Sequence, residues 1–141
     1  MPVTIRPAEP ADLEAIIALG REWGYELAPE NVRRHSQTDE HRAFAIADVG
    51  GEAAGWIEVV LEDEITGPPR GHITALVVGE KFRRQGVGQQ LVDFAKQWAA
   101  QKGAKTIRVR TRVDRKEAPD FYRAIGFEEA KRQIVFEAKL S

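Results

Sequence analysis

Residues 73–103 read ITALVVGEKFRRQGVGQQLVDFAKQWAAQKG, and this stretch decides the fold. The run Ile73–Val78 is apolar and rich in β-branched residues, which predicts a buried strand. A short charged turn leads from it into the basic, glycine-bearing hexapeptide 83–88. The segment that follows carries apolar residues at helical spacing and ends before Gly103, a typical C-terminal cap. The predicted order is therefore strand, turn, helix.

The hexapeptide places glycines where this helix begins. The first turn of a helix has backbone N–H groups without intrahelical partners, and the helix dipole adds partial positive charge there. Gly86 and Gly88 have no Cβ, so a ligand oxygen can approach the main chain closely. Arg83 and Arg84 add two permanent positive charges. Together these features predict a phosphate cradle.

The cradle does not fit the common nucleotide motifs. A Walker A loop needs Gly-Lys followed by Ser or Thr, whereas Gly88 is followed by Gln89 and Gln90. A dinucleotide fingerprint needs a third glycine at the position of Leu91. Neither ATP nor NAD is indicated.

The hexapeptide resembles the acetyl-CoA signature of the GNAT superfamily of N-acetyltransferases: Gln or Arg, two residues of any type, Gly, any residue, then Gly or Ala. Arg83, Gly86 and Gly88 fill its three defined positions. The pattern Ala118-x-x-Phe121-Tyr122-x-x-x-Gly126-Phe127 follows at the distance usual in that family. The resemblance implies acetyl-CoA as the cosubstrate, with these cofactor-binding residues: Leu76, Val77, Val78, Arg83, Arg84, Gln85, Gly86, Val87, Gly88, Gln89, Asp114, Arg115, Phe121 and Tyr122.

The bulk properties predict one globular domain over residues 1–141, with 43% hydrophobic and 30% charged residues. The net charge of −1 gives no argument for a nucleic-acid partner. The absence of cysteine excludes disulfides and thiolate metal sites, and the three histidines show no zinc-site spacing, so no metal is expected. No apolar run approaches the ~18 residues of a membrane helix. The N-terminus does not read as a signal peptide, so we expect a cytoplasmic protein without a membrane partner.

The remaining pattern predicts an α+β fold. Gly50 and Gly51 read as the turn of a hairpin, and the Gly/Pro-rich stretch 63–71 reads as a loop. The order of elements matches the GNAT fold, a mixed and mostly antiparallel sheet splayed between its fourth and fifth strands. Strands are expected at 3–6, 44–47, 54–62, 72–78, 106–112 and 134–140, and helices at 10–23, 29–36, 87–102 and 119–125.

The resemblance also implies where the thioester would lie. In relatives, main chain near a bulge in the fourth strand holds the pantetheine arm like an added strand, and this maps to Leu76, Val77 and Val78. The Val78 N–H is the candidate oxyanion donor. Core packing of these side chains does not conflict with that role, because main-chain groups make the contacts.

Tyr122 is the candidate general acid. It lies where many relatives place a tyrosine beside the CoA sulfur, and a phenol with a pKa near ~10 is protonated at neutral pH. The alternative is a core tyrosine, although the adjacent Phe121 could fill the core alone.

The general base is the less obvious part. Many relatives carry a glutamate two residues before Leu76, where this chain has Thr74. Glu58 on the neighbouring strand could take the proton directly or through water. The commoner role of a strand carboxylate is an outward, solvated one. An amine that arrives neutral would need no base.

The acceptor site in relatives lies between the first two helices and the loops beside the third and fourth strands. Here that region offers Trp23, Tyr25, Glu26, Glu58 and the acidic run 62–64, and aromatic faces with carboxylates suit a cationic amine. A helix-end core residue and a solvated loop are the alternatives. Many relatives also carry an asparagine after the fifth strand, for which Asp114 or Arg115 could substitute.

The predicted function is transfer of the acetyl group of acetyl-CoA to a primary amine of a small molecule or peptide, by direct attack. One alternative is a non-catalytic, regulatory CoA-binding module, suggested by Thr74. Another is nucleic-acid binding through a stripe of Arg108, Arg110 and Arg112, although no aromatic platforms accompany it. The apolar run 134–136 could contribute to a homodimer interface.

Overall fold

The computed structural model describes residues 2–114 and 116–141. The chain forms two compact units, Met1–Arg110 and Thr111–Ser141. The first unit holds a five-stranded sheet and three α-helices, and the second holds one helix. Among the described residues, no helix combines the length and apolarity needed to cross a bilayer.

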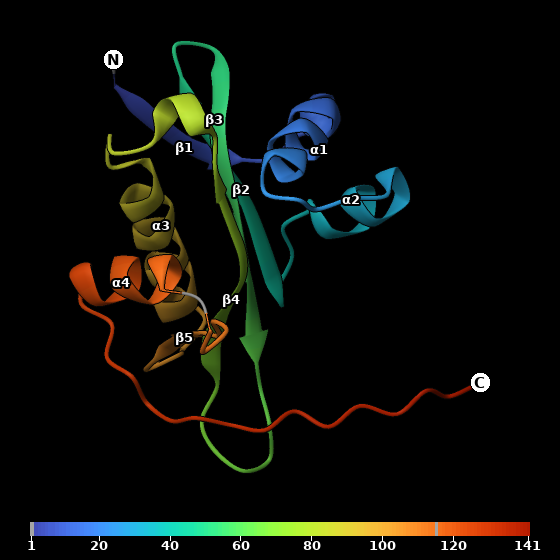
Figure 1. The fold of residues 1–141 in the computed structure, drawn as a ribbon, viewed down its shortest axis with the longest axis vertical. Helices are drawn as coiled ribbons and strands as arrows, with labels where there is room; N and C mark the ends of the chain where they lie inside the picture. Colours follow the sequence, from blue (N-terminus) through green and yellow to red (C-terminus); the bar gives the residue numbers. More distant parts are fainter. Residues whose placement is uncertain (1, 115) are drawn as a thin grey trace. The chain divides into compact units, whose positions relative to one another are not determined.

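The strands follow one another in the sheet in sequence order (Figure 1). β1 to β4 pair antiparallel, as hairpins and short connections favour, and β5 pairs parallel with β4. Gly50 and Gly51 form the predicted hairpin turn with positive φ angles of 61° and 89°. The strands are β1 (Val3–Pro7), β2 (Arg42–Val49), β3 (Glu52–Glu62), β4 (Arg70–Val78) and β5 (Ile107–Val109).

The predicted splay between the fourth and fifth strands is confirmed. β5 pairs only with Gly71, His72 and Ile73 of β4. Within the described residues, the rest of β4, from residue 74 to 78, therefore has no strand on that side. This open edge offers backbone groups that an extended ligand can pair with.

The helices cover both faces of the sheet in the first unit. α3 (Val87–Gln101) packs on one face, and α1 (Leu13–Glu22) packs with α2 (Pro29–His35) on the other (Figure 1). Two short 3-10 turns, Pro10–Asp12 and Glu80–Phe82, precede α1 and α3. α4 (Glu117–Ala124) belongs to the second unit and is followed, after Ile125, by Gly126, whose φ is 102°.

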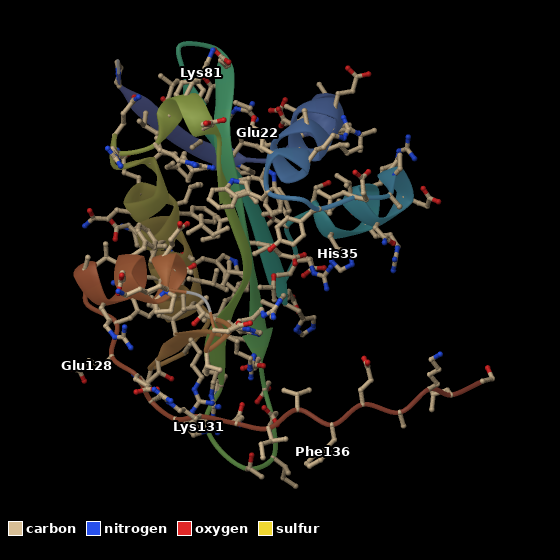
Figure 2. All side chains as sticks on the ribbon, viewed as in Figure 1. Glu22, His35, Lys81, Glu128, Lys131 and Phe136 are labelled. Carbon is tan, nitrogen blue, oxygen red and sulfur yellow. The ribbon has the colours of Figure 1, made fainter. Side chains whose placement is uncertain are left out.

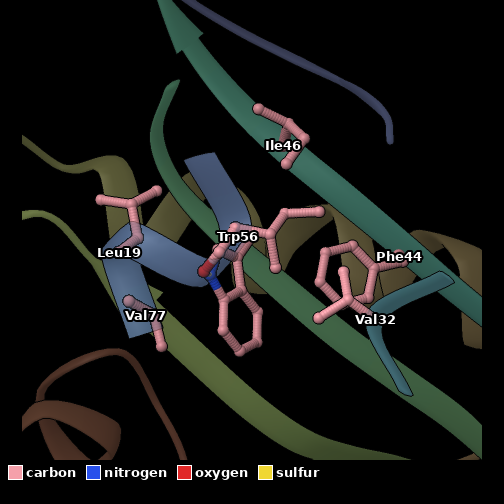
Figure 3. Packing of buried hydrophobic residues seen from close by; sticks show 7 residues of the cluster. Leu19, Val32, Phe44, Ile46, Trp56 and Val77 are labelled. Atoms are coloured by element: carbon pink, nitrogen blue, oxygen red, sulfur yellow. Dashed lines mark hydrogen bonds between the residues drawn. The ribbon is translucent and has the colours of Figure 1, made fainter. Parts of the chain in front are cut away.

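Buried apolar residues fill both sides of the sheet. Under α3, the predicted stripe of Val87, Leu91, Ala95, Trp98 and Ala99 is buried. On the α1–α2 side, aliphatic side chains surround the Trp56 indole and the Phe44 ring (Figure 3). That second cluster consists of Ile16, Leu19, Val32, Phe44, Ile46, Trp56 and Val77.

The expected last strand at 134–140 is wrong. These residues form neither helix nor strand, and Ile134, Val135, Phe136 and Leu140 are at least 80% exposed. A strand needs the backbone of a neighbour, and a sequence pattern does not say whether a neighbouring edge is available. β5 also ends at Val109, before the predicted end at residue 112.

Asp12 ties the 3-10 turn that precedes α1 to β1. Its carboxylate accepts two hydrogen bonds from the Arg6 guanidinium, at 2.8 and 2.9 Å, and a third from the Glu9 N–H at 2.7 Å. The hydrogen bonds from Arg6 are the main cause that lowers the pKa of Asp12 below its ordinary value of 3.8. The carboxylate therefore contributes stability at pH values above about 4, and this contribution is lost as the pH falls through the lowered pKa.

We expect Asp12→Asn to lower the free energy of unfolding by about 2 kcal/mol at pH 7, because the paired ionic hydrogen bonds are lost. The difference from the wild type should shrink progressively as the pH falls below about 4, because the wild-type carboxyl becomes protonated as the pH passes through its lowered pKa. Urea unfolding at pH 7 and pH 3 measures both effects. Asp63→Asn, at an exposed loop position, is the control. An equal loss of stability at both pH values would contradict the assignment to the ion pair.

Candidate active site

The predicted phosphate cradle forms at the N-terminus of α3. Gly86 precedes the first helical residue in the left-handed conformation, with φ 78° and ψ 8°. The backbone N–H of Gln90 donates to the Gly86 carbonyl at 3.1 Å and makes the first hydrogen bond of the helix. The N–H groups of residues 87–89 therefore come before the first bonded turn. Arg84 also has a positive φ of 63°, which is rare and costly for a side-chain-bearing residue. A tight turn thus aims free backbone donors outward at the end of a 15-residue helix.

The cradle has room for an anion. A Cβ placed on Gly86 would have no atom within 4 Å, so the space over the turn is open. The Arg83 guanidinium lies 4.2 Å from the centre of the Trp23 ring, which holds this charge beside the turn. Open space, unpaired N–H donors and fixed positive charge are what a pyrophosphate requires. The residues present therefore fit the pyrophosphate of CoA.

The open edge of β4 presents the Val78 N–H. The Gly79 N–H donates to Ala54 at 2.8 Å, and the Val77 carbonyl faces Gly55, so both residues direct main-chain groups toward β3. Successive strand residues point their backbone groups to opposite sides. The N–H and carbonyl of Val78 therefore face the open side, and its carbonyl accepts the Trp23 indole N–H at 3.0 Å. By the same alternation Leu76 also faces the open edge.

The bulge lies slightly before this edge. Ala75 pairs with Glu58 and Ile73 pairs with Val59, so Thr74 is the extra residue of β4. The Thr74 hydroxyl donates to the Glu58 carboxylate at 2.5 Å. The residue that stands in place of the family's glutamate thus positions the carboxylate of the neighbouring strand.

Glu58 is held by further contacts. Its Oε2 lies 2.8 Å from His35 Nδ1 and 3.8 Å from Arg42 Nη1, and its side chain is 14% exposed. The expectation of an outward, solvated carboxylate is therefore wrong. The reason is that α2 ends at His35 and brings the His35 side chain against the sheet, where it contacts Glu58. Figure 2 labels His35.

His35 also lies at this site, although no sequence pattern points to it. Its Nδ1 lies 2.6 Å from Arg42 Nη1 as well as 2.8 Å from Glu58. A guanidinium only donates, so Nδ1 accepts from Arg42 when it is unprotonated and donates to Glu58 when it carries a proton. No local signal marks His35, because its partner Glu58 is 23 residues away.

A pocket of about 160 Å³ opens beside this carboxylate. Three of its wall residues, Asn31, His35 and Glu58, are polar. The rest of its wall is apolar and comes from α1, α2, the loop between them and strands β2 to β4: Ile16, Leu27, Val32, Phe44, Trp56 and Ala75.

The other predicted acceptor residues lie elsewhere. Trp23 contacts the cradle and the open edge of β4, as described above, and does not line this pocket. Tyr25 and Glu26 are exposed in the loop after α1. Of the acceptor set, only Glu58 lines the pocket.

In the second unit, Tyr122 lies on α4 and is 8% exposed. Its ring packs edge-on against Phe121 and Phe127, with centroid distances of 5.0 and 5.3 Å. Tyr122 is thus more buried than the adjacent Phe121. Asp114 accepts two hydrogen bonds from the exposed Arg112, and Arg115 lies outside the described residues.

The predicted arginine stripe does not form. β5 ends at Val109, so Arg110 and Arg112 are not strand residues. Arg110 donates to Glu62 at 3.2 Å and contacts the His72 ring, while Arg112 pairs with Asp114. Burial, together with the Arg110 charge, lowers the pKa of His72 below 6.5, so this ring is neutral at pH 7. Among the described residues, no group of His, Cys, Asp or Glu side chains is placed to hold a metal ion.

Comparison with known proteins agrees with this geometry. The model of the acetyltransferase (GNAT) family matches residues 11–127. An aminoglycoside N(6')-acetyltransferase type 1 from Stenotrophomonas maltophilia is 31% identical over 144 residues, covering 97% of this chain and 94% of the relative. An N-alpha-acetyltransferase from Sulfurisphaera tokodaii is 27% identical over 140 residues, covering 90% of this chain and 81% of the relative. The crystal structure of aminoglycoside N-acetyltransferase AAC(6')-Iy with CoA superposes on this chain with a TM-score of 0.81 at 25% identity. The superposition covers 96% of this chain and 99% of that structure.

Proposed function

The chain belongs to the GNAT family of acetyltransferases and is an acetyl-CoA-dependent N-acetyltransferase, and on that premise we propose that its acceptor is the primary amine of a small molecule, with Glu58 as general base and Tyr122 as general acid. The observation that carries the proposal is the open edge of β4, where the Val78 N–H points away from β3 beside the cradle. A thioester held along that edge would present its carbonyl oxygen to this donor.

Residues of the first unit account for binding and charge stabilisation. The N–H groups at the start of α3, with Arg83 and Arg84, hold the pyrophosphate, while Leu76 and Val78 pair with the pantetheine arm. The Val78 N–H stabilises the negative charge that develops on the carbonyl oxygen as the amine attacks.

Two proton transfers complete the reaction. As the C–N bond forms and the C–S bond breaks, Glu58 accepts the amine proton directly or through water. The Tyr122 hydroxyl gives a proton to the departing thiolate. Contacts from Thr74 and His35 support the role of Glu58, because they fix both oxygens of its carboxylate.

The relatives' names differ in the acceptor. One relative is named for aminoglycosides and another for α-amines, so the acceptor of this chain has to be inferred from its own pocket. A free amino sugar and a peptide N-terminus are both primary amines that the proposed chemistry can use.

The test is release of free thiol from acetyl-CoA by the purified protein, with and without a panel of primary amines. We expect amine-dependent, saturable release in the wild type. Glu58→Gln should lower kcat about 100-fold, the range of general-base catalysis, and leave acetyl-CoA affinity within twofold. Glu14→Gln, at an exposed position of α1, is the matched control and should retain the wild-type kcat. Thiol release that no amine accelerates would instead favour a CoA-binding module without transferase activity.

A further inference from the structure

We infer that the acceptor carries, beside its primary amine, a compact apolar group of about six carbons that binds in the pocket between α1, α2 and strands β2 to β4. This inference rests on the proposed function and names its substrate class: an arylalkylamine or a branched alkylamine.

The volume of the pocket sets the size of the apolar group. The pocket measures about 160 Å³, and an apolar cavity of about 150 Å³ in another protein holds one benzene molecule. A phenyl group or a branched alkyl group therefore fills it. Only one ring of a group of two or three linked rings can be held within this volume.

The aromatic part of the pocket wall is apolar. Phe44 and Trp56 stack with their ring centres 5.1 Å apart, and Val32 lies against Phe44 (Figure 3). The Trp56 indole N–H already donates to the Ile16 carbonyl at 3.1 Å, so the indole offers the pocket only apolar surface. Hydroxyl groups placed against this wall would lose their water partners, at a cost that burial of an apolar group does not incur.

The negative charge in the pocket wall already has partners. Glu58 is the only acidic residue in the described wall, and the Arg42 guanidinium 3.8 Å away balances its charge. Both oxygens of Glu58 already have partners within the protein. A polycationic acceptor would therefore gain little binding free energy in this pocket. An acceptor with a single amine next to an apolar group needs no further anionic partners.

The position of the pocket along β4 sets the distance between the apolar group and the amine. Ala75 lies in the pocket wall, and Val78 lies three residues further on, about 10 Å along a strand. A phenyl ring in the pocket with two methylene groups before the nitrogen extends toward that donor. An amine attached directly to the ring stays within the pocket, so 2-phenylethylamine should be a better acceptor than aniline.

The experiment compares kcat/KM of the wild type for 2-phenylethylamine, ethylamine and 6-amino-6-deoxyglucose, a polar amine of similar size. We expect 2-phenylethylamine to exceed the other two at least 30-fold, the gain for burying one phenyl group. A higher kcat/KM for the amino sugar would overturn the inference and leave the transferase function intact. Thiol release that none of these amines or the wider amine panel accelerates would instead remove the proposed function.

Two variants locate the effect in the pocket. Ala75→Leu fills the pocket and should lower kcat/KM for 2-phenylethylamine at least tenfold more than it lowers kcat/KM for ethylamine. Leu27→Ala enlarges the pocket and should raise the preference for 2-(1-naphthyl)ethylamine over 2-phenylethylamine at least fivefold. Ala11→Leu adds the same bulk at an exposed position and serves as the control. Equal changes for all amines in both pocket variants would show that the apolar group binds elsewhere.

Discussion

Gly86→Glu is expected to weaken acetyl-CoA binding at least 100-fold. The new side chain enters open space, because a Cβ at this position has no atom within 4 Å, so the helix below it can keep its packing. Its carboxylate would lie where the cradle receives a pyrophosphate. Two like charges about 4 Å apart repel by about 4 kcal/mol near a protein surface, more than the roughly 2.7 kcal/mol that a 100-fold change requires.

The same helix supplies a matched control. Gly103 follows the C-terminal end of α3, has a φ of 90°, and would likewise have no atom within 4 Å of an added Cβ. Gly103→Glu therefore introduces the same side chain with the same left-handed strain, about 1–2 kcal/mol, far from the cradle along the helix. Calorimetric titration should give a dissociation constant for Gly103→Glu within threefold of the wild type. Equal weakening in both variants would point to lost stability, and unchanged binding in Gly86→Glu would place the pyrophosphate elsewhere.

The parts of the site that the sequence predicts well are local. The strand 73–78, the glycine turn and the start of α3 lie within 30 residues, and each follows from the residue types at that point of the chain. The prediction that the Val78 N–H is available as a donor needs one further fact, which is that the next strand diverges from β4. The family resemblance supplies this fact.

The parts that the sequence misses depend on contacts between distant segments. Glu58 is held by Thr74, 16 residues away, and by His35, 23 residues away. The alternation of β3 places Glu58 on one face of the sheet but does not say that α2 covers it. Trp23 is predicted to lie at the acceptor site, but it contacts Arg83 of the cradle instead. The prediction of a strand at 134–140 is wrong for a related reason, because this segment does not pair with the edge of another strand.

Tyr122→Phe is expected to lower kcat about 100-fold while acetyl-CoA affinity changes less than twofold. The substitution removes one hydroxyl and keeps the ring that packs against Phe121 and Phe127. A departing thiolate that receives no proton leaves more slowly, and general-acid catalysis typically contributes 100-fold or more. The affinity should persist because the contacts proposed for the pyrophosphate and pantetheine are made by residues of β4 and α3.

Phe127→Leu separates this role from packing. It disturbs the same aromatic cluster, since the Phe127 ring lies 5.3 Å from Tyr122, but it keeps the hydroxyl. We expect it to lower the midpoint of urea unfolding more than Tyr122→Phe does, and to lower kcat less than threefold. Single-turnover measurements with saturating amine would show whether the chemical step itself is slowed. A Tyr122→Phe enzyme with wild-type kcat would leave Tyr122 as a core residue, and the thiolate would then take its proton from water or from another side chain.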